Sequence, residues 1–343
     1  MKITFNYSAY QKKNVILQFI CIGMRRYVLF IGLLLFCFTA MGQKQKKGVD
    51  FRLWEDSLIQ LRDDCMSASS ETERLSRNED FMYLLENVLQ MEGSFKYQWD
   101  SVRNFSVVAS PDKLFKIFTW YIIKDDYSYE NFGFLQVYNA ARKHYDVIPL
   151  YDKRYSIDYP KTFVGNHNRW YGAVYYKVIP LESGEKTYYT LLGWNGNDIF
   201  TNEKIIEVLH FKNDMTPVFG ANIFKKYKEK CSRVIISYSK DATMSLNYEY
   251  QSYNVGSGKR DPKTKQVVYD KVYAKLIVFD ELIPLDENVP NLPSFMVPES
   301  SLNQGFVAEK GKWLYLQSVN RRNPDKDMPN YKRKTRQIYV PNH

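Results

Sequence analysis

Histidine and cysteine, the side chains that most often bind metals or act as nucleophiles, are scarce in this sequence. Its 343 residues include four histidines and four cysteines. His343 ends the chain, and His144, His167 and His210 do not have the spacing of a metal-binding set. The His-Glu-x-x-His helix of zinc proteases and the Gly-x-Ser-x-Gly turn of serine hydrolases are also missing. We therefore expect no metal and no cofactor, and no motif defines a reaction.

The partial matches to known motifs have simpler structural explanations. Segment 256–259 (Gly-Ser-Gly-Lys) resembles a phosphate-binding loop, but Arg260 stands where a Ser or Thr must bind magnesium, so we expect a flexible hairpin loop. The side chains of Asn195 to Asp198 are suited to a calcium loop. However, Asn-Gly is the strongest hairpin-turn signal, because both residues tolerate positive φ. We expect a structural turn there.

Polar side chains within expected strands are the remaining candidates for chemistry. His144 and Asp146 lie two positions apart, so they share one strand face and can reach one metal ion or each other. Nearly any pair with this spacing would do the same. Glu207 and Glu249 lie in strands, as glycosidase carboxylates often do. A glutamate that faces solvent is the simpler explanation for both.

The cysteines allow at most one disulfide in the mature protein. Cys21 and Cys37 lie in a segment that we expect to be removed, which leaves Cys65 and Cys231. Cys65 falls on the apolar stripe of an expected helix, where a cysteine serves as a small buried apolar residue. We favour this interpretation, and the disulfide is the alternative because exported compartments oxidise thiols.

Residues 1–42 have the features of a cleavable secretory signal. Residues 24–26 (Met-Arg-Arg) are basic, residues 27–38 form an unbroken apolar run, and Ala40 and Gly42 fit the −3 and −1 positions of a signal-peptidase site. The run is shorter than the roughly 20 residues of a transmembrane helix. We expect cleavage after Gly42, with Met24 as an alternative start. The mature chain then has no transmembrane span and is exported to the periplasm, the outer membrane or the extracellular space.

Positive charge is concentrated at the two ends of the chain. The formal net charge is +10, but residues 1–42 hold five basic and no acidic side chains, and residues 320–343 hold seven basic and two acidic ones. The body between them is neutral, so it lacks the basic face of a nucleic-acid-binding protein. We interpret 320–343 as an exposed basic tail, which would attract anionic surfaces.

The body of the chain is predicted to be rich in antiparallel β structure. Aromatic residues make up 16% of the sequence, and they favour strands. From residue 105 onward, short apolar segments alternate with turn signals without long helices between them, which argues against a parallel βαβ sheet. Expected strands are 105–109, 114–123, 132–138, 144–150, 171–179, 187–194, 203–211, 233–239, 244–250, 272–279, 306–308 and 313–319. Several are apolar on both faces and must be covered twice.

Turn signals and prolines predict how some of these strands connect. Lys240-Asp241 is expected to join strands 233–239 and 244–250 as a hairpin. Residues 256–266 are polar and basic and are expected to form an exposed loop. Residues 286–298 contain three prolines and are expected to form an irregular crossing rather than a strand.

Two helices are expected before the strands, over about 50–92. Apolar residues recur at helical spacing from Trp54 to Cys65, and Ser70-x-x-Glu73 forms a capping box for the second helix. Residues 43–49 are expected to be a linker, and 50–319 a single domain.

We therefore predict an α+β fold, mainly antiparallel β, arranged as a sandwich or barrel-like meander. A β-propeller is the alternative, because Ser110-Pro111-Asp112-Lys113 before an aromatic strand also occurs in propeller blades. A clean repeat of 40–50 residues, which a propeller would show, is not evident.

Aromatic residues on adjacent expected strands are the candidate ligand-binding site. Tyr and Trp side chains that the core does not need can stack on sugar rings or fill a peptide groove. Strand alternation should turn about half of them inward. The candidates are Trp170, Tyr171, Tyr175, Tyr176, Tyr188 and Trp194.

Three segments resemble an uncharacterised family of exported proteins of Gram-negative bacteria. They are 191–198 (Leu-Leu-Gly-Trp-Asn-Gly-Asn-Asp), 233–239 (Arg-Val-Ile-Ile-Ser-Tyr-Ser) and 277–284 (Ile-Val-Phe-Asp-Glu-Leu-Ile-Pro). The likeness extends from about Phe105 to Val319. It implies export and one folded body, and it supplies no site because no activity is assigned to that family.

Two classes of function fit these observations. The favoured one is a non-catalytic binding or structural protein of the cell envelope, with a glycan, a peptide or another envelope protein as its partner. The alternative is a hydrolase that acts on an envelope or extracellular polymer. Such an enzyme needs acid and base groups that converge on one cleft, and these can come from distant strands.

Overall fold

The computed structural model describes residues 49–319 of the chain. In this part the fold is α+β and mainly antiparallel β, as predicted, with two helices followed by three open sheets. The predicted signal segment 1–42, nearly all of the predicted linker 43–49 and the predicted tail 320–343 lie outside the described residues. No helix within 49–319 is long and apolar enough to span a membrane.

The two helices are α2 (Phe51–Ser67) and α3 (Glu71–Leu89). The Ser70 side chain accepts a hydrogen bond from the backbone N–H of Glu73 at 3.3 Å, which is the first half of the expected capping box. Cys65 is fully buried on the inner face of α2. Both Cys65 and Cys231 are free thiols, so the structure agrees with the interpretation of Cys65 as a buried apolar residue.

The first sheet is an antiparallel meander in chain order. Its strands are β1 (Phe105–Ala109), β2 (Phe115–Ile123), β3 (Tyr129–Asn139) and β4 (His144–Tyr151). The turn before β2 closes with a hydrogen bond from the N–H of Lys113 to the carbonyl oxygen of Ser110 at 2.9 Å. The Ser-Pro-Asp-Lys turn predicted from the sequence is therefore present.

The middle sheet has the order β5-β9-β8-β7-β6, and β11 pairs with the first half of β8. The strands are β5 (Gly165–Asn166), β6 (Val174–Ser183), β7 (Lys186–Asn195), β8 (Thr201–Phe211), β9 (Pro217–Phe219) and β11 (Val234–Ser239). Three short 3-10 helices also belong to this part of the chain. The first, η1 (Ser94–Lys96), precedes β1; η2 (Arg154–Ser156) follows β4, and η3 (His167–Arg169) follows β5.

The third sheet has the order β10-β15-β14-β13-β12. Its strands are β10 (Phe224–Lys225), β12 (Leu246–Arg260), β13 (Val267–Pro284), β14 (Met296–Glu309) and β15 (Lys312–Leu316). The 3-10 helix η4 (Pro293–Phe295) lies between β13 and β14.

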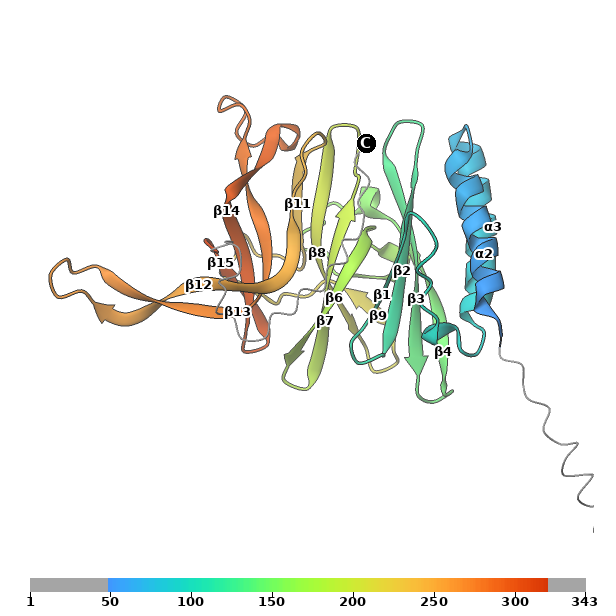
Figure 1. Cartoon of the computed structure of the whole chain (residues 1–343), viewed down its shortest axis with the longest axis horizontal. Helices are drawn as coiled ribbons and strands as arrows, with labels where there is room; N and C mark the ends of the chain where they lie inside the picture. The colour runs from blue at the N-terminus through green and yellow to red at the C-terminus, as the bar shows by residue number, and fades with distance from the viewer. Residues whose placement is uncertain (1–48, 320–343) are drawn as a thin grey trace, which may run out of the picture. The chain divides into compact units, whose positions relative to one another are not determined.

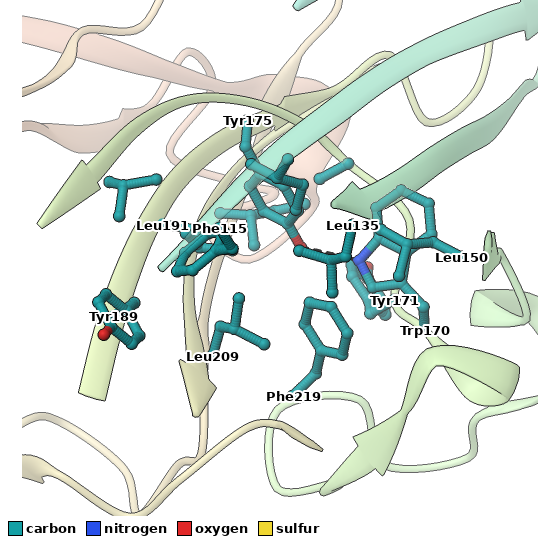
Figure 2. Close-up of a cluster of buried hydrophobic side chains, with 14 of the residues drawn as sticks. Phe115, Leu135, Leu150, Trp170, Tyr171, Tyr175, Tyr189, Leu191, Leu209 and Phe219 are labelled. Atoms are coloured by element: carbon teal, nitrogen blue, oxygen red, sulfur yellow. Dashed lines mark hydrogen bonds between the residues drawn. The ribbon is translucent and has the colours of Figure 1, made fainter. Parts of the chain in front are cut away.

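These elements form four layers, in the order helix pair, first sheet, middle sheet, third sheet (Figure 1). Each interface between layers has its own apolar cluster. Figure 2 shows the cluster between the first and middle sheets, where Phe115 and Leu135 face Leu191 and Leu209. The first and middle sheets are therefore covered on both faces, which explains their doubly apolar strands.

The propeller alternative fits the strand order within each sheet, but it does not fit the number of sheets. Strands β1–β4, β6–β9 and β12–β15 each form a consecutive meander, as in a propeller blade. A propeller, however, contains at least four blades around a channel. Residues 49–319 contain three sheets, and none of them closes into a barrel.

The expected hairpin across Lys240-Asp241 is wrong. A turn is present, because the N–H of Ala242 donates to the carbonyl oxygen of Ser239 at 3.1 Å. However, β11 pairs with β8, and β12 pairs with β13 of another sheet. The turn signal predicts only that the chain changes direction there. Which strand pairs with β11 or β12 depends on which sheet has an edge available for hydrogen bonding and apolar side chains that cover the new strand.

Two other segments also differ from expectation. Residues 256–260 are exposed, as predicted, except for the half-buried Ser257, but they continue β12 instead of forming a loop, and only 261–266 form the turn. The irregular crossing ends at η4, so that Met296 to Pro298 already belong to β14 and pair with β13.

Candidate functional site

The loop that joins β7 to β8 is held in one conformation by its own side chains. The Asp198 carboxylate accepts hydrogen bonds from the N–H groups of Phe200 and Thr201, both at 2.8 Å. Asn197 has a positive φ of 49°, and its Nδ2 donates to Asp198 at 3.0 Å and to Thr201 Oγ1 at 2.7 Å. The sequence Asn195-Gly-Asn-Asp thus forms the structural turn that was expected, and hydrogen bonds within the loop stabilise it.

Residues of neighbouring elements also hold this loop in place. A Cβ at Gly196 would lie 2.5 Å from the Tyr129 ring, so only glycine fits there. The ammonium group of Lys240 donates to the carbonyl oxygen of Gly196 at 2.8 Å and lies 4.4 Å from the centroid of the same ring. Burial lowers the pKa of Lys240. The first sheet and the end of β11 therefore both position the loop.

An open pocket of about 310 Å³ lies beside the loop. This volume is at the lower end of the range for small-molecule sites. The loop, β11 and the η4 region each contribute to it: its lining is Asn197, Asp198, Phe200, Thr201, Ser237, Leu292, Pro293 and Ser294. Phe200 is 64% exposed and Leu292 46% exposed, so the pocket combines hydroxyl and carboxamide groups with uncovered apolar surface.

A buried carboxylate lies behind the pocket wall. Ser237 Oγ donates to Glu203 Oε1 at 3.3 Å, and Tyr171 Oη donates to Glu203 Oε2 at 2.9 Å. Glu203 is 6% exposed, and burial raises its pKa despite the nearby Arg154 guanidinium. Burial, followed by the charge of Glu203, also raises the pKa of Tyr171. Ser237 thus connects the pocket to a carboxyl group that holds its proton more tightly than usual.

The chemistry of this pocket suits the binding of a neutral polar ligand. Asp198 uses its carboxylate to hold the loop, so it is not free to act as a base without disturbing the turn. Among residues 49–319, no group of three or more His, Cys, Asp or Glu side chains is arranged to hold a metal ion. The Thr201 hydroxyl is likewise used within the loop, because it donates to Asp198 and accepts a bond from Asn197. What remains for a ligand is the Ser294 hydroxyl and the acceptor side of the Ser237 hydroxyl, together with the Phe200 ring.

Three of the six aromatic residues predicted as a binding site are buried between the first and middle sheets. Trp170 and Tyr175 have no exposed surface, and Tyr171 has 5%. Trp170 Nε1 donates to Tyr175 Oη at 3.0 Å, as Figure 2 shows. These side chains contribute to the core and offer no surface to a ligand in this structure.

The other three aromatic residues are partly buried and pack against neighbouring side chains. Tyr176 and Tyr188 pack against the cluster between the middle and third sheets, and Tyr176 Oη donates to the carbonyl oxygen of Leu246 at 2.9 Å. Trp194 packs edge-on against Tyr129, with ring centroids 5.6 Å apart. Because three of the six side chains are buried, the six do not form a continuous exposed strip. Trp194 lies at the end of β7, next to the β7–β8 loop.

The remaining candidates from the sequence have structural roles. His144 Nε2 lies 3.1 Å from Asp146 Oδ1, so the two residues contact each other as their spacing allowed. Glu207 does not face solvent, as had been expected; it is fully buried and paired with Arg233. Glu249 is half-buried on β12, where its Oε1 accepts a bond of 3.4 Å from Gln251.

Sequence reasoning missed Phe200, Ser237 and Leu292. A local sequence signal could have identified Phe200, because Ile199 and Phe200 are two large apolar residues in an otherwise polar turn. In the structure their side chains are 50% and 64% exposed. Ser237 and Leu292 come from distant parts of the chain: Ser237 reaches the pocket because β11 pairs with β8, and Leu292 reaches it because the third sheet packs on the middle one.

Comparison of the chain with protein-family models, with curated proteins and with solved structures found no match. The resemblance of segments 191–198, 233–239 and 277–284 to an exported family therefore stays a prediction. In the structure, two of these segments lie on either side of β8, because β7 and β11 both pair with it.

Proposed function

We propose that this protein is an exported, non-catalytic binding protein of the bacterial cell envelope, and that it binds a short saccharide in the pocket beside the β7–β8 loop. The observation that carries this proposal is Phe200, an aromatic side chain left 64% exposed beside a pocket lined with hydroxyl and carboxamide groups. A sugar ring presents an apolar face and a rim of hydroxyls, and these match an aromatic ring and polar side chains.

The hydrogen bonds that hold the loop support a binding function. The backbone of Phe200 is held by its N–H, which donates to Asp198, and by its carbonyl oxygen, which accepts a bond of 2.9 Å from the N–H of Lys240. A ligand then does not have to order the loop backbone, so less binding energy is lost. This arrangement favours selective binding without a conformational change.

Export rests on the predicted signal segment, and it has its own test. N-terminal sequencing of the protein from the periplasm or the medium should begin at Gln43. Finding Met1 or Met24 at the mature N-terminus would contradict export by cleavage after Gly42.

The binding proposal is tested by a saccharide array followed by calorimetric titration of the strongest ligand. Phe200→Ala should weaken binding about 10-fold or more, because a buried aromatic contact often dominates an interface. Ile199→Ala is the matched control, since Ile199 is the exposed neighbour that does not line the pocket. Equal affinity of the Phe200→Ala variant and the wild type would refute the proposed site.

Hydrolysis of an envelope or extracellular polymer is the second candidate, and Glu203 favours it. A carboxyl group with a raised pKa is suited to act as a general acid, and Ser237 links Glu203 to the pocket. Turnover assays on the polymers that bind will distinguish the two functions. Turnover abolished by Glu203→Gln would replace the binding proposal by the enzymatic one.

A further inference from the structure

The hairpin of β12 and β13 extends beyond the third sheet as a two-stranded arm. Strand β13 pairs with β14 from Leu276 onward, and before that residue its only partner within residues 49–319 is β12. Figure 1 shows this pair projecting away from the stacked sheets. We define residues 254–271 as the arm.

The arm exposes more apolar surface than a free hairpin should. Tyr269 is 62% exposed, Val255 42%, Val267 40% and Val268 39%. A two-stranded hairpin without a third strand or a packed face is marginally stable in water. The exposed side chains therefore suggest that a partner covers the arm when the protein functions.

The two faces of the arm differ in charge. The register pairs Gly256 with Tyr269 and Arg260 with Val267, and residues opposite each other or two apart share a face. Arg260, Val267, Tyr269 and Lys271 therefore lie on one side, which we call the cationic face. Asp270 lies on the opposite face.

The turn adds further positive charge. Within the arm, five basic side chains (Lys259, Arg260, Lys263, Lys265 and Lys271) stand against Asp261 and Asp270. The Asp261 carboxylate accepts hydrogen bonds from the N–H groups of Lys263 and Thr264 at 2.9 and 2.7 Å, so it stabilises the turn. The end of the arm is thus cationic as well as partly apolar.

We propose that the arm docks on a bilayer that contains anionic phospholipid, with its cationic face toward the membrane. Basic side chains are attracted to anionic headgroups, and valine and tyrosine fit the boundary between headgroups and acyl chains. An anionic polysaccharide would use the charge but would leave the valines exposed. A second copy of the arm would bring like charges together, which argues against self-association.

The first experiment is co-sedimentation of the full chain with vesicles of equimolar phosphatidylglycerol and phosphatidylcholine. The variant Arg260→Gln/Lys263→Gln/Lys265→Gln should bind about 100-fold more weakly, since each basic residue near an anionic surface contributes about fivefold. All other basic segments are unchanged, so the difference reports the arm. Undiminished binding of this variant would overturn the proposal.

The second experiment tests the face. Val267→Thr/Tyr269→Thr should weaken vesicle binding, whereas Val255→Thr/Val268→Thr, on the opposite face, should not. Threonine is β-branched like valine and favours strands, so both pairs are expected to keep the hairpin. Equal loss in the two variants would refute the assignment of the cationic face.

A fluorescent probe on the arm distinguishes binding to a membrane from binding to a soluble anionic polymer. Tyr269→Trp should show a blue shift of the added tryptophan fluorescence, after subtraction of the wild-type spectrum, with the anionic vesicles but not with phosphatidylcholine alone. A shift with dextran sulfate and none with vesicles would overturn the proposal. Saccharide binding at the Phe200 pocket is measured independently, so failure of either proposal leaves the other standing.

Discussion

Arg233 and Glu207 form an ion pair inside the protein, with Nε of Arg233 2.6 Å from Oε2 of Glu207 and no exposed surface on either side chain. Arg233 also donates to the carbonyl oxygens of Pro160 and Phe219. The pair therefore ties β8 to β9, to the start of β11 and to the segment after η2.

Removing either partner should destabilise the fold. Arg233→Met or Glu207→Leu is expected to lower the free energy of unfolding by about 3–5 kcal/mol, because the remaining charge is buried without its counter-ion. Urea denaturation measures the effect. The double variant Glu207→Leu/Arg233→Met should recover much of the loss, and single variants within 1 kcal/mol of the wild type would contradict a buried ion pair.

The raised pKa of Glu203 predicts a specific pH dependence. In the folded protein this carboxyl binds a proton more tightly than in the unfolded chain, so its stabilising contribution is present at low pH and is lost as pH rises through the folded pKa. From pH about 4.3 upward, Glu203→Gln should gain stability relative to the wild type. Urea denaturation across this range measures it, with Glu185→Gln, in the exposed β6–β7 turn, as the control. A constant difference between variant and wild type would contradict the prediction.

Gly196→Ala should displace the β7–β8 loop. The new methyl group would meet the Tyr129 ring at 2.5 Å, so the ring or the loop must move, at a cost of about 1–3 kcal/mol. Thermal unfolding gives the loss of stability, and calorimetric titration gives the loss of saccharide affinity. Gly256→Ala is the matched control, because its Cβ would make only an ordinary contact of 3.6 Å with Val267. Similar behaviour of the two variants would show that the loop adapts.

The thiols of Cys65 and Cys231 should stay reduced and unreactive in the folded protein. Burial raises the pKa of both, that of Cys231 to about 11, and the reactive species is the thiolate. Iodoacetamide at mildly alkaline pH should modify them only after denaturation, as read from their peptides by mass spectrometry. A peptide pair that is disulfide-linked through Cys65 and Cys231 would refute this prediction.

The local elements of this protein follow from short stretches of sequence. The capping contact at Ser70, the turn at Ser110 and the β7–β8 turn at Asn195 depend on residues within a few positions of one another. Helix periodicity and strand alternation act over the same range. These features, and the α+β class with them, could therefore be predicted before the structure was known.

The stacking of three sheets decided what each strand face contacts. Alternation shows that Glu203, Glu207 and Tyr175 belong to particular faces, but it cannot show that a second sheet covers them. Glu207 was therefore expected in solvent and is buried. The same stacking buried three of the six aromatic candidates and placed β11 and β12 in different sheets. It also brought Leu292 to the β7–β8 loop, whereas the pairing of β11 with β8 brought Ser237 there. Both kinds of contact join residues far apart in the sequence, so no local pattern encodes them.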